Sequence, residues 1–219
     1  MPEAVLFDLD GTLADTAPDL AGAVNTLIEE RGHAPLPLAT LRPYVSSGAR
    51  GLIGAALGLT PADPAYPELQ RRFLAIYEER LCAGTRLFHG IEAHLDDLER
   101  QAIPWGVVTN KSQRFAIPLM EQLGLRQRSA CIVCGDSAPR PKPFADPLQL
   151  AGAVLGLPTK ACLYVGDDER DVISGRRVGM GTVVAAWGYL GNGSPPGDWG
   201  ADAIATTPDE ILGAGRHTR

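Results

Sequence analysis

Short apolar runs alternate with longer amphipathic stretches along most of this 219-residue chain. Each run has the length of a buried strand and contains valine, which favours strands. We predict five strands, at residues 4–7, 105–108, 131–134, 162–165 and 182–186. Apolar positions that recur every three or four residues predict helices between them, at 89–100, 114–123, 147–155 and 172–178, with a short helix near the end of the chain. This alternation indicates a doubly wound parallel α/β sheet.

Residues 17–82 contain no strand pattern. A helix is expected here with Pro18 in its first turn and Gly32 after its end. Further helices are expected in the same segment over 38–44, 52–57 and 64–81, with a loop at 46–51. The pattern therefore predicts an α/β core domain formed by residues 1–16 and 83–219, and an all-helical domain formed by residues 17–82.

Composition and charge narrow the class of protein. The net charge of -6 argues against a nucleic-acid partner, because such proteins carry clustered Lys and Arg. We expect no membrane partner and a cytoplasmic location, since no apolar run reaches spanning length and no signal-peptide pattern opens the chain. The four cysteines lack zinc-binding spacing, and Cys131 and Cys134, which form a C-x-x-C in a strand-like run, are expected to be buried core thiols. Both a monomer and a homodimer remain open.

Polar residues follow the predicted strands at the point where each strand ends. Asp8 and Asp10 follow the first strand, Thr109 and Asn110 the second, and Asp167 the fourth. Ligands of open α/β sheets bind at the carboxyl ends of the strands, so we expect these side chains at one rim. Two carboxylates 4 Å apart repel by roughly 4 kcal/mol at an effective dielectric constant of about 20. A cation or a proton is therefore expected beside Asp8 and Asp10.

These residues carry a resemblance to the haloacid dehalogenase superfamily of phosphohydrolases, over essentially the full chain. The first motif of that superfamily, D-x-D-G-T, matches residues 8–12. The second, a strand that ends in Ser or Thr, matches Thr109, and the third, a Lys followed by Pro, matches Lys142. The fourth, G-D-x-x-x-D, matches residues 166–171. The resemblance implies a Rossmann-like core, with the helical segment as a C1 cap.

The same resemblance implies hydrolysis of a phosphomonoester through an aspartyl-phosphate. It makes Asp8 the nucleophile and Asp10 the acid and base of the two steps. Mg²⁺, or alternatively Mn²⁺, is expected on the carboxylates of Asp8 and Asp167 and on the Asp10 carbonyl, which are hard oxygen ligands. Asp171 is expected to hold the motif lysine or metal-bound water. Asp168 either supports the site in the same way or is a solvated carboxylate.

Five residues are expected to meet the substrate or its phosphate. Thr109 offers a hydroxyl and Asn110 an amide to the phosphate oxygens, and Gly11 lies beside them. Lys142 supplies a fixed positive charge. Arg50, in the expected loop of the helical segment, is either a surface residue or the partner of a substrate carboxylate.

Within the superfamily, the chain resembles the phosphoglycolate phosphatase-like branch, and more narrowly bacterial phosphatases of N-acetylmuramic acid 6-phosphate in peptidoglycan recycling. The narrower resemblance is carried by residues 13–19, 47–50, 105–111, 165–171 and 192–202. Either substrate carries a carboxylate. A sugar phosphomutase and a broad-specificity sugar-phosphate phosphatase would share every motif and remain alternatives. A dehalogenase would not need Asp10, and a non-enzymatic phospho-acceptor or binding module is disfavoured because every motif position is present.

Overall fold

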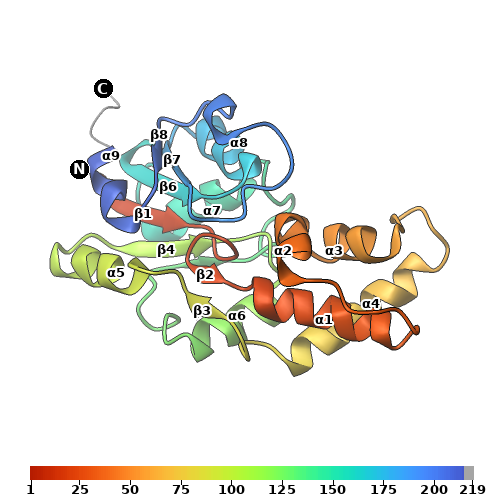
Figure 1. Ribbon diagram of the computed structural model, residues 1–219. Helices are drawn as coiled ribbons and strands as arrows, with labels where there is room; N and C mark the ends of the chain where they lie inside the picture. Colours follow the sequence, from red (N-terminus) through yellow and green to blue (C-terminus); the bar gives the residue numbers. More distant parts are fainter. Residues whose placement is uncertain (215–219) are drawn as a thin grey trace.

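Six parallel strands form the main sheet of the computed structural model, which describes residues 1–214 (Figure 1). They are β1 (Ala4–Phe7), β4 (Trp105–Val108), β5 (Ile132–Val133), β6 (Cys162–Gly166), β7 (Gly181–Ala185) and β8 (Ala203–Ala205). Their order is β5-β4-β1-β6-β7-β8, so the first strand of the chain lies inside the sheet. The five predicted strands are thus confirmed, and β8 adds a short edge that the pattern did not reveal.

Side chains of β1 alternate between two cores, because successive residues of a strand point to opposite faces. Val5 and Phe7 pack in the core that contains side chains of α5 (Ile91–Arg100) and α6 (Gln113–Gln122). Ala4 and Leu6 pack in the core on the other face. The helices that complete the α/β part are α7 (Asp146–Leu155), α8 (Glu169–Arg177) and α9 (Ile211–Ala214), and its 3₁₀ turns are Thr159–Ala161, Pro196–Asp198 and Pro208–Glu210. Helices on both faces confirm the doubly wound architecture.

Helices of the 17–82 segment pack around a hydrophobic cluster of their own. We call them the helical layer: α1 (Ala17–Glu29), α2 (Leu38–Leu41), the 3₁₀ turn Arg42–Ser47, α3 (Gly48–Leu57) and α4 (Tyr66–Glu79). The layer lies beyond the carboxyl ends of β1 and β4 (Figure 1). Phe115 and Tyr189, from the α/β part, join its cluster. The boundaries at residues 17 and 82 stay predictions.

The prediction of a loop at residues 46–51 is wrong. The 3₁₀ turn continues to Ser47, and α3 begins at Gly48. Two glycines in the first turn lowered the helix propensity of this stretch and hid the helix start. Gly51 is needed there, because a Cβ at this position would lie 2.5 Å from the carbonyl oxygen of Tyr44.

A two-stranded antiparallel pair marks where the chain enters and leaves the helical layer. It consists of β2 (Ala14–Asp15) and β3 (Arg86–Leu87). Beside it, the buried Asp19 accepts hydrogen bonds from the Gly84 N–H (2.7 Å), the Thr85 N–H (2.9 Å) and the Thr85 hydroxyl (2.7 Å). One carboxylate on α1 therefore holds the returning chain.

Replacing Asp19 by Ala should lower the free energy of unfolding by about 2 kcal/mol, because buried N–H and O–H donors lose their acceptor. Urea unfolding would measure this change. The exposed Glu29 on the same helix offers a matched control, since Glu29→Ala should change the stability by less than about 0.5 kcal/mol. Equal stability of the two variants would contradict a structural role for Asp19.

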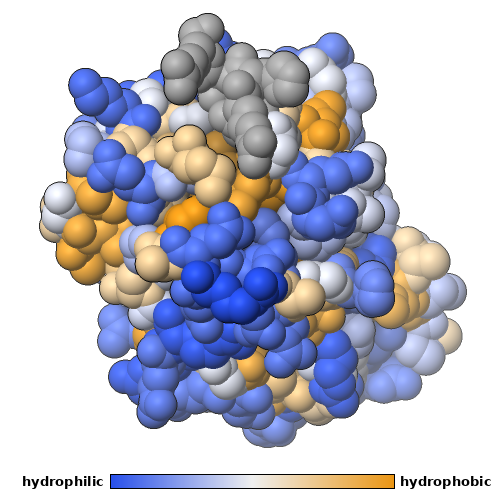
Figure 2. Space-filling view, turned by 90° about the vertical axis from the view of Figure 1, so that its left-hand side faces the viewer, coloured by the Kyte–Doolittle hydropathy of each residue, from blue (hydrophilic) through white to orange (hydrophobic). Residues whose placement is uncertain are grey.

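The surface away from the helical layer is mainly hydrophilic, with apolar side chains in small groups (Figure 2). Within residues 1–214, no helix has the combination of length and apolar character that a bilayer span requires. Cys131 and Cys134 are free thiols in the cores on opposite faces of the sheet. Their odd spacing on a strand explains this separation.

Candidate active site

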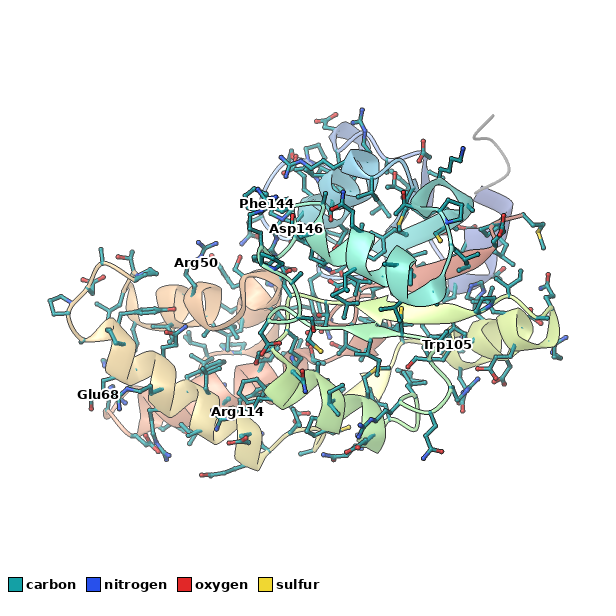
Figure 3. All side chains as sticks on the ribbon, turned by 180° about the vertical axis from the view of Figure 1, so that it is seen from behind. Arg50, Glu68, Trp105, Arg114, Phe144 and Asp146 are labelled. Carbon is teal, nitrogen blue, oxygen red and sulfur yellow. The ribbon has the colours of Figure 1, made fainter. Side chains whose placement is uncertain are left out.

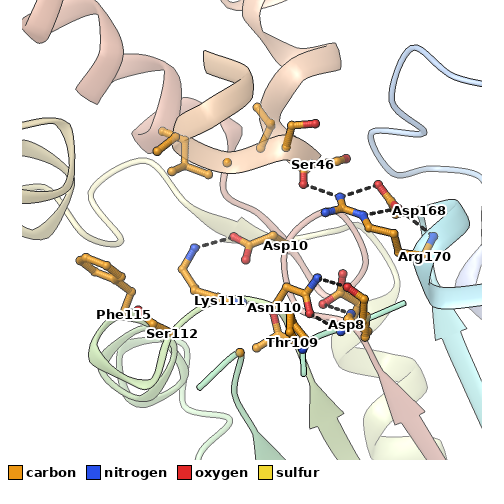
Figure 4. Close-up of a pocket in the computed structure, with 18 of the residues that line it drawn as sticks. Asp8, Asp10, Ser46, Thr109, Asn110, Lys111, Ser112, Phe115, Asp168 and Arg170 are labelled. Atoms are coloured by element: carbon orange, nitrogen blue, oxygen red, sulfur yellow. Dashed lines mark hydrogen bonds and ion pairs between the residues drawn. The ribbon is translucent and has the colours of Figure 1, made fainter. Parts of the chain in front are cut away.

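A cavity of about 480 Å³ lies between the helical layer and the carboxyl ends of the central strands (Figure 4). Its wall contains side chains from the ends of β1, β4 and β6 and from α1 and α4. The predicted site residues that line it are Asp8, Asp10, Thr109, Asn110, Lys142, Asp167, Asp168 and Asp171. The structure thus gathers residues that are up to 163 positions apart in the chain, from 8 to 171. Gly11 and Arg50 do not line this cavity.

Lys142 is buried at the base of the cavity, with 3% of its surface exposed. Its Nζ lies 2.9 Å from Asp8 Oδ1 and 2.7 Å from Asp171 Oδ1. The ammonium also donates to the Tyr164 hydroxyl (2.7 Å) and to the Val108 carbonyl (3.0 Å). Burial opposes the charge, but Asp171 and Asp8 outweigh burial and raise the pKa of Lys142. A permanent cation therefore lies against the Asp8 carboxylate.

Asn110 holds Lys142 in place. Its side-chain nitrogen donates to the Lys142 carbonyl at 3.0 Å, and its side-chain oxygen accepts from the Lys142 N–H at 2.9 Å. The side-chain nitrogen of Asn110 has a second N–H, which no hydrogen bond occupies in the described chain. The expected contact of Asn110 with the phosphate therefore stays a prediction. Thr109 is buried, and its Oγ1 accepts the Lys111 N–H at 3.1 Å. The Thr109 hydroxyl proton is still available to a ligand.

Three carboxylates form an acidic cluster at the end of β1 and β6. One oxygen each from Asp8, Asp167 and Asp171 lies within 4.8 Å of the others. Burial, followed by Asp8 and Asp171, raises the pKa of Asp167 well above its ordinary value. A divalent cation would offset this repulsion, and an all-oxygen donor set is the kind that Mg²⁺ prefers.

The three carboxylates of the cluster differ in their hydrogen-bond partners. Asp171 uses Oδ1 for Lys142 and Oδ2 for the Asp168 N–H at 3.1 Å. Asp167 accepts the Thr12 hydroxyl and the Tyr189 N–H, each at 2.8 Å, which fix the direction of its carboxylate. Asp8 also contacts Lys142 through Oδ1, but no hydrogen bond occupies its Oδ2 among the described residues, whereas both oxygens of Asp171 are used. Asp8 therefore fits a metal better than Asp171.

The absence of a side chain at Gly11 leaves room for the Asp167 carboxylate. A Cβ on Gly11 would lie 2.1 Å from Asp167 Oδ2, and the backbone φ of +89° is one that other residues rarely adopt. The Gly11 N–H donates to the Ala14 carbonyl at 3.0 Å. The only backbone donor of Gly11 is thus used inside the turn, and the expected contact between Gly11 and the substrate stays a prediction.

The Asp10 carboxylate turns toward a lysine that the sequence analysis missed. Asp10 Oδ1 accepts from the Thr16 hydroxyl at 2.6 Å and from Lys111 Nζ at 2.8 Å (Figure 4). The Lys111 ammonium also lies 4.8 Å from the ring centre of Tyr77 in the helical layer. Burial opposes its charge, but the Asp10 carboxylate outweighs burial and raises the pKa of Lys111. The sequence did contain a signal for Lys111 as a site residue, because this cation directly follows Asn110 at the end of a predicted strand.

Asp168 is the N-cap of α8 and shares a capping box with Asp171. It also binds the Arg170 guanidinium through Nε at 2.7 Å and Nη2 at 2.8 Å. Arg170 in turn donates to the Ser46 carbonyl of the helical layer at 2.6 Å (Figure 4). The Asp168 side chain therefore pairs with Arg170 and the start of α8, and its expected support of the motif lysine or metal-bound water stays a prediction. Arg170, which the sequence analysis also missed, joins the two parts of the molecule.

Arg50 is exposed on α3 and points away from α1 and α4 (Figure 3). It lines a neighbouring cavity of about 440 Å³, together with Tyr44 and Trp199. Arg170 and Ser46 contribute to the walls of both cavities. A contact of Arg50 with the substrate stays a prediction, and it would need a substrate that extends beyond these two residues.

Comparisons with known proteins agree with this geometry. The chain is 42% identical over 210 residues to a phosphoglycolate phosphatase of Xanthomonas campestris pv. campestris, covering 96% of this chain and 95% of the relative. It is 41% identical over 210 residues to an N-acetylmuramic acid 6-phosphate phosphatase of Pseudomonas aeruginosa, covering 96% and 93%.

Solved structures and a family model give the same assignment. A crystal structure of a predicted phosphoglycolate phosphatase from Haemophilus somnus 129pt matches with a TM-score of 0.85 at 26% identity, covering 96% of each chain. The model of the haloacid dehalogenase-like hydrolases matches residues 5–185. The chain therefore belongs to the haloacid dehalogenase-like hydrolase family.

Proposed function

We propose that this protein is a Mg²⁺-dependent phosphomonoester hydrolase whose substrate is a small phosphate with a carboxylate, either N-acetylmuramic acid 6-phosphate or 2-phosphoglycolate. The observation that carries the proposal is the contact of the permanently charged Lys142 with Asp8, inside an acidic cluster that fits a divalent cation. Relatives at 42% and 41% identity are named for these two substrates. In this proposal the protein is cytoplasmic and acts on a free small-molecule metabolite.

Asp8 is placed for attack on phosphorus. Its Oδ1 accepts the Leu9 N–H at 2.7 Å and lies 2.9 Å from Lys142 Nζ, so the orientation of the carboxylate is fixed. In the first step a carboxylate oxygen forms a bond to phosphorus as the bond to the ester oxygen breaks. Lys142 stabilises the negative charge that spreads over the phosphoryl oxygens.

Asp10 serves as the acid and then as the base. It gives a proton to the departing ester oxygen, and later takes one from the water that cleaves the aspartyl-phosphate. The Thr16 hydroxyl and Lys111 hold this carboxylate at the cavity wall. Mg²⁺, held by Asp8, Asp167 and the Asp10 carbonyl, would offset the charge of the carboxylates and the phosphate.

The helical layer acts as a cap over the site in this proposal. It closes one side of the cavity with apolar side chains, among them Val45 and Phe73. Such a cover excludes bulk water and contacts the part of the substrate beyond the phosphate.

Removal of divalent metal should lower turnover by about 1,000-fold, because the cation contributes several kcal/mol of charge stabilisation. The measurement is the release of inorganic phosphate from both proposed substrates in EDTA, followed by addition of excess Mg²⁺. Recovery on adding Mg²⁺ is the control for intact protein. Undiminished turnover in the chelator would reject the metal-dependent mechanism, and transfer of phosphate within the substrate without its release would identify a mutase.

A further inference from the structure

Three cations line the cavity in the described part of the chain: Lys142, Arg170 and Lys111. The Lys142 ammonium has acceptors for all its N–H groups in Val108, Tyr164 and the carboxylates. Arg170 uses Nε and Nη2 for Asp168 and the Ser46 carbonyl. These two cations are therefore largely occupied by the protein itself.

Lys111 differs from both. Its ammonium has three N–H donors. Asp10 accepts one at 2.8 Å and the Tyr77 hydroxyl lies close enough to accept a second, which leaves at least one N–H without an acceptor among residues 1–214. Its side chain is 8% exposed, so water does not supply the missing acceptors freely. A buried ammonium with unused donors has a strong preference for a second anion.

Two polar atoms of the helical layer are also unpaired at the cavity. Tyr77 is 1% exposed and lies against Lys111, and the proton of its hydroxyl has no acceptor within residues 1–214, because a lysine ammonium can only donate. The buried Ser46 hydroxyl likewise lacks a partner in the described chain. Burial of such groups is unfavourable unless a ligand satisfies them. Both line the same cavity as Asp8.

The rest of this wall is apolar, and the cavity is large. Leu20, Val45, Phe73, Leu74 and Phe115 line it. Its volume of about 480 Å³ falls within the range of pockets that enclose drug-sized ligands. The space beyond the phosphate position therefore suits an organic group that carries an anion and some apolar surface.

We propose that Lys111 binds the carboxylate of the substrate, with the Tyr77 hydroxyl as an additional donor, and so determines which phosphomonoesters the enzyme selects. The inference rests on the proposed function, because it assigns the carboxylate of that substrate class to a residue. In this arrangement the phosphate lies at Asp8 and Lys142, and the carboxylate lies at Lys111, on the side of Asp10 and α4.

The test compares pairs of substrates that differ in the carboxylate. N-acetylmuramic acid 6-phosphate is paired with N-acetylglucosamine 6-phosphate, which lacks the lactyl group, and 2-phosphoglycolate with 2-hydroxyethyl phosphate. The measured quantity is the ratio of kcat/KM within each pair. Because Lys111 also contacts Asp10, its variants should slow both members of a pair, and the ratio cancels this shared loss.

For the pair that the wild-type enzyme discriminates, Lys111→Met should lower the ratio by about 30-fold, mainly through a higher KM for the carboxylate-bearing member. Lys111→Arg keeps the charge and should restore most of the ratio. Tyr77→Phe removes only the hydroxyl and should lower the same ratio by about 5-fold. This last variant keeps the inference testable if Lys111→Met folds poorly.

The rival cations provide the controls. Arg50→Ala and Arg170→Met should leave the ratio within about 3-fold of the wild type. A large fall in Arg50→Ala with none in Lys111→Met would overturn the inference and place the carboxylate in the neighbouring cavity. A wild-type enzyme without preference for the carboxylate-bearing members would reject the proposed substrate class, and the role of Lys111 with it. If Lys111→Met keeps the wild-type preference for the carboxylate-bearing member, the role of Lys111 is rejected while the proposed substrate class stands.

Discussion

Asp8→Asn should lower kcat by at least about 10⁴-fold, a change of roughly 5.5 kcal/mol in the activation free energy. The substitution keeps the shape of the side chain and the acceptor for the Leu9 N–H. It removes the nucleophilic carboxylate, and a neutral amide cannot form the aspartyl-phosphate. The release of inorganic phosphate in the presence of Mg²⁺ would measure the effect.

The same variant should unfold with a free energy within about 1 kcal/mol of the wild type in the absence of metal. Its removal of a charge relieves repulsion of Asp167 but also breaks the ion pair of Asp8 with Lys142, which keeps Asp171 as its partner. Asp136 offers a matched control, since it also follows a strand but accepts the Gln113 N–H outside the cavity. Asp136→Asn should keep full turnover. Comparable activity in Asp8→Asn and Asp136→Asn would reject Asp8 as the nucleophile.

Lys142→Met should damage both stability and catalysis. The free energy of unfolding should fall by about 3–5 kcal/mol, because the change leaves Asp8 and Asp171 buried without their cation. Turnover should fall by about 1,000-fold, because the transferred phosphoryl group loses a fixed positive charge. Urea unfolding and phosphate release measure the two effects separately.

A double variant distinguishes these two roles of Lys142. Lys142→Met combined with Asp171→Asn removes one of the carboxylates that lost its partner, and should recover about half of the lost stability. Turnover should stay low, since the charge beside Asp8 is still missing. Recovery of activity together with stability would mean that Lys142 serves folding alone.

The sequence predicted the sheet well because parallel strands are buried on both faces and appear as continuous apolar runs. The two-residue strands β2 and β3 and the edge strand β8 are too short to give a periodic signal. The acidic residues could be placed for a related reason: Asp8 and Asp167 each directly follow a central strand, and neighbouring parallel strands end at the same rim.

The pattern of apolar and polar positions did not predict which side chains pair with one another. The hydrogen bonds of the Asn110 amide to the backbone of Lys142, which is 32 positions away in the chain, gave no signal in the sequence. Lys111 was overlooked because its partner, Asp10, lies 101 positions earlier. Such pairs depend on distances between segments that only the packed structure brings together. Arg50 was expected in a loop and lies instead in the first turn of α3, because two glycines lowered the helix propensity of this stretch.

The shared anchor at Asp19 has a consequence for how the substrate enters. The chain leaves the sheet and comes back to it at one edge of the helical layer, and a single carboxylate fastens the two passages there. An attachment of this kind opposes sliding but leaves rotation about the fastened edge, in the manner of a door. Such a rotation would require the hydrogen bond between Arg170 and the Ser46 carbonyl to break, so this bond would act as the latch of the cavity.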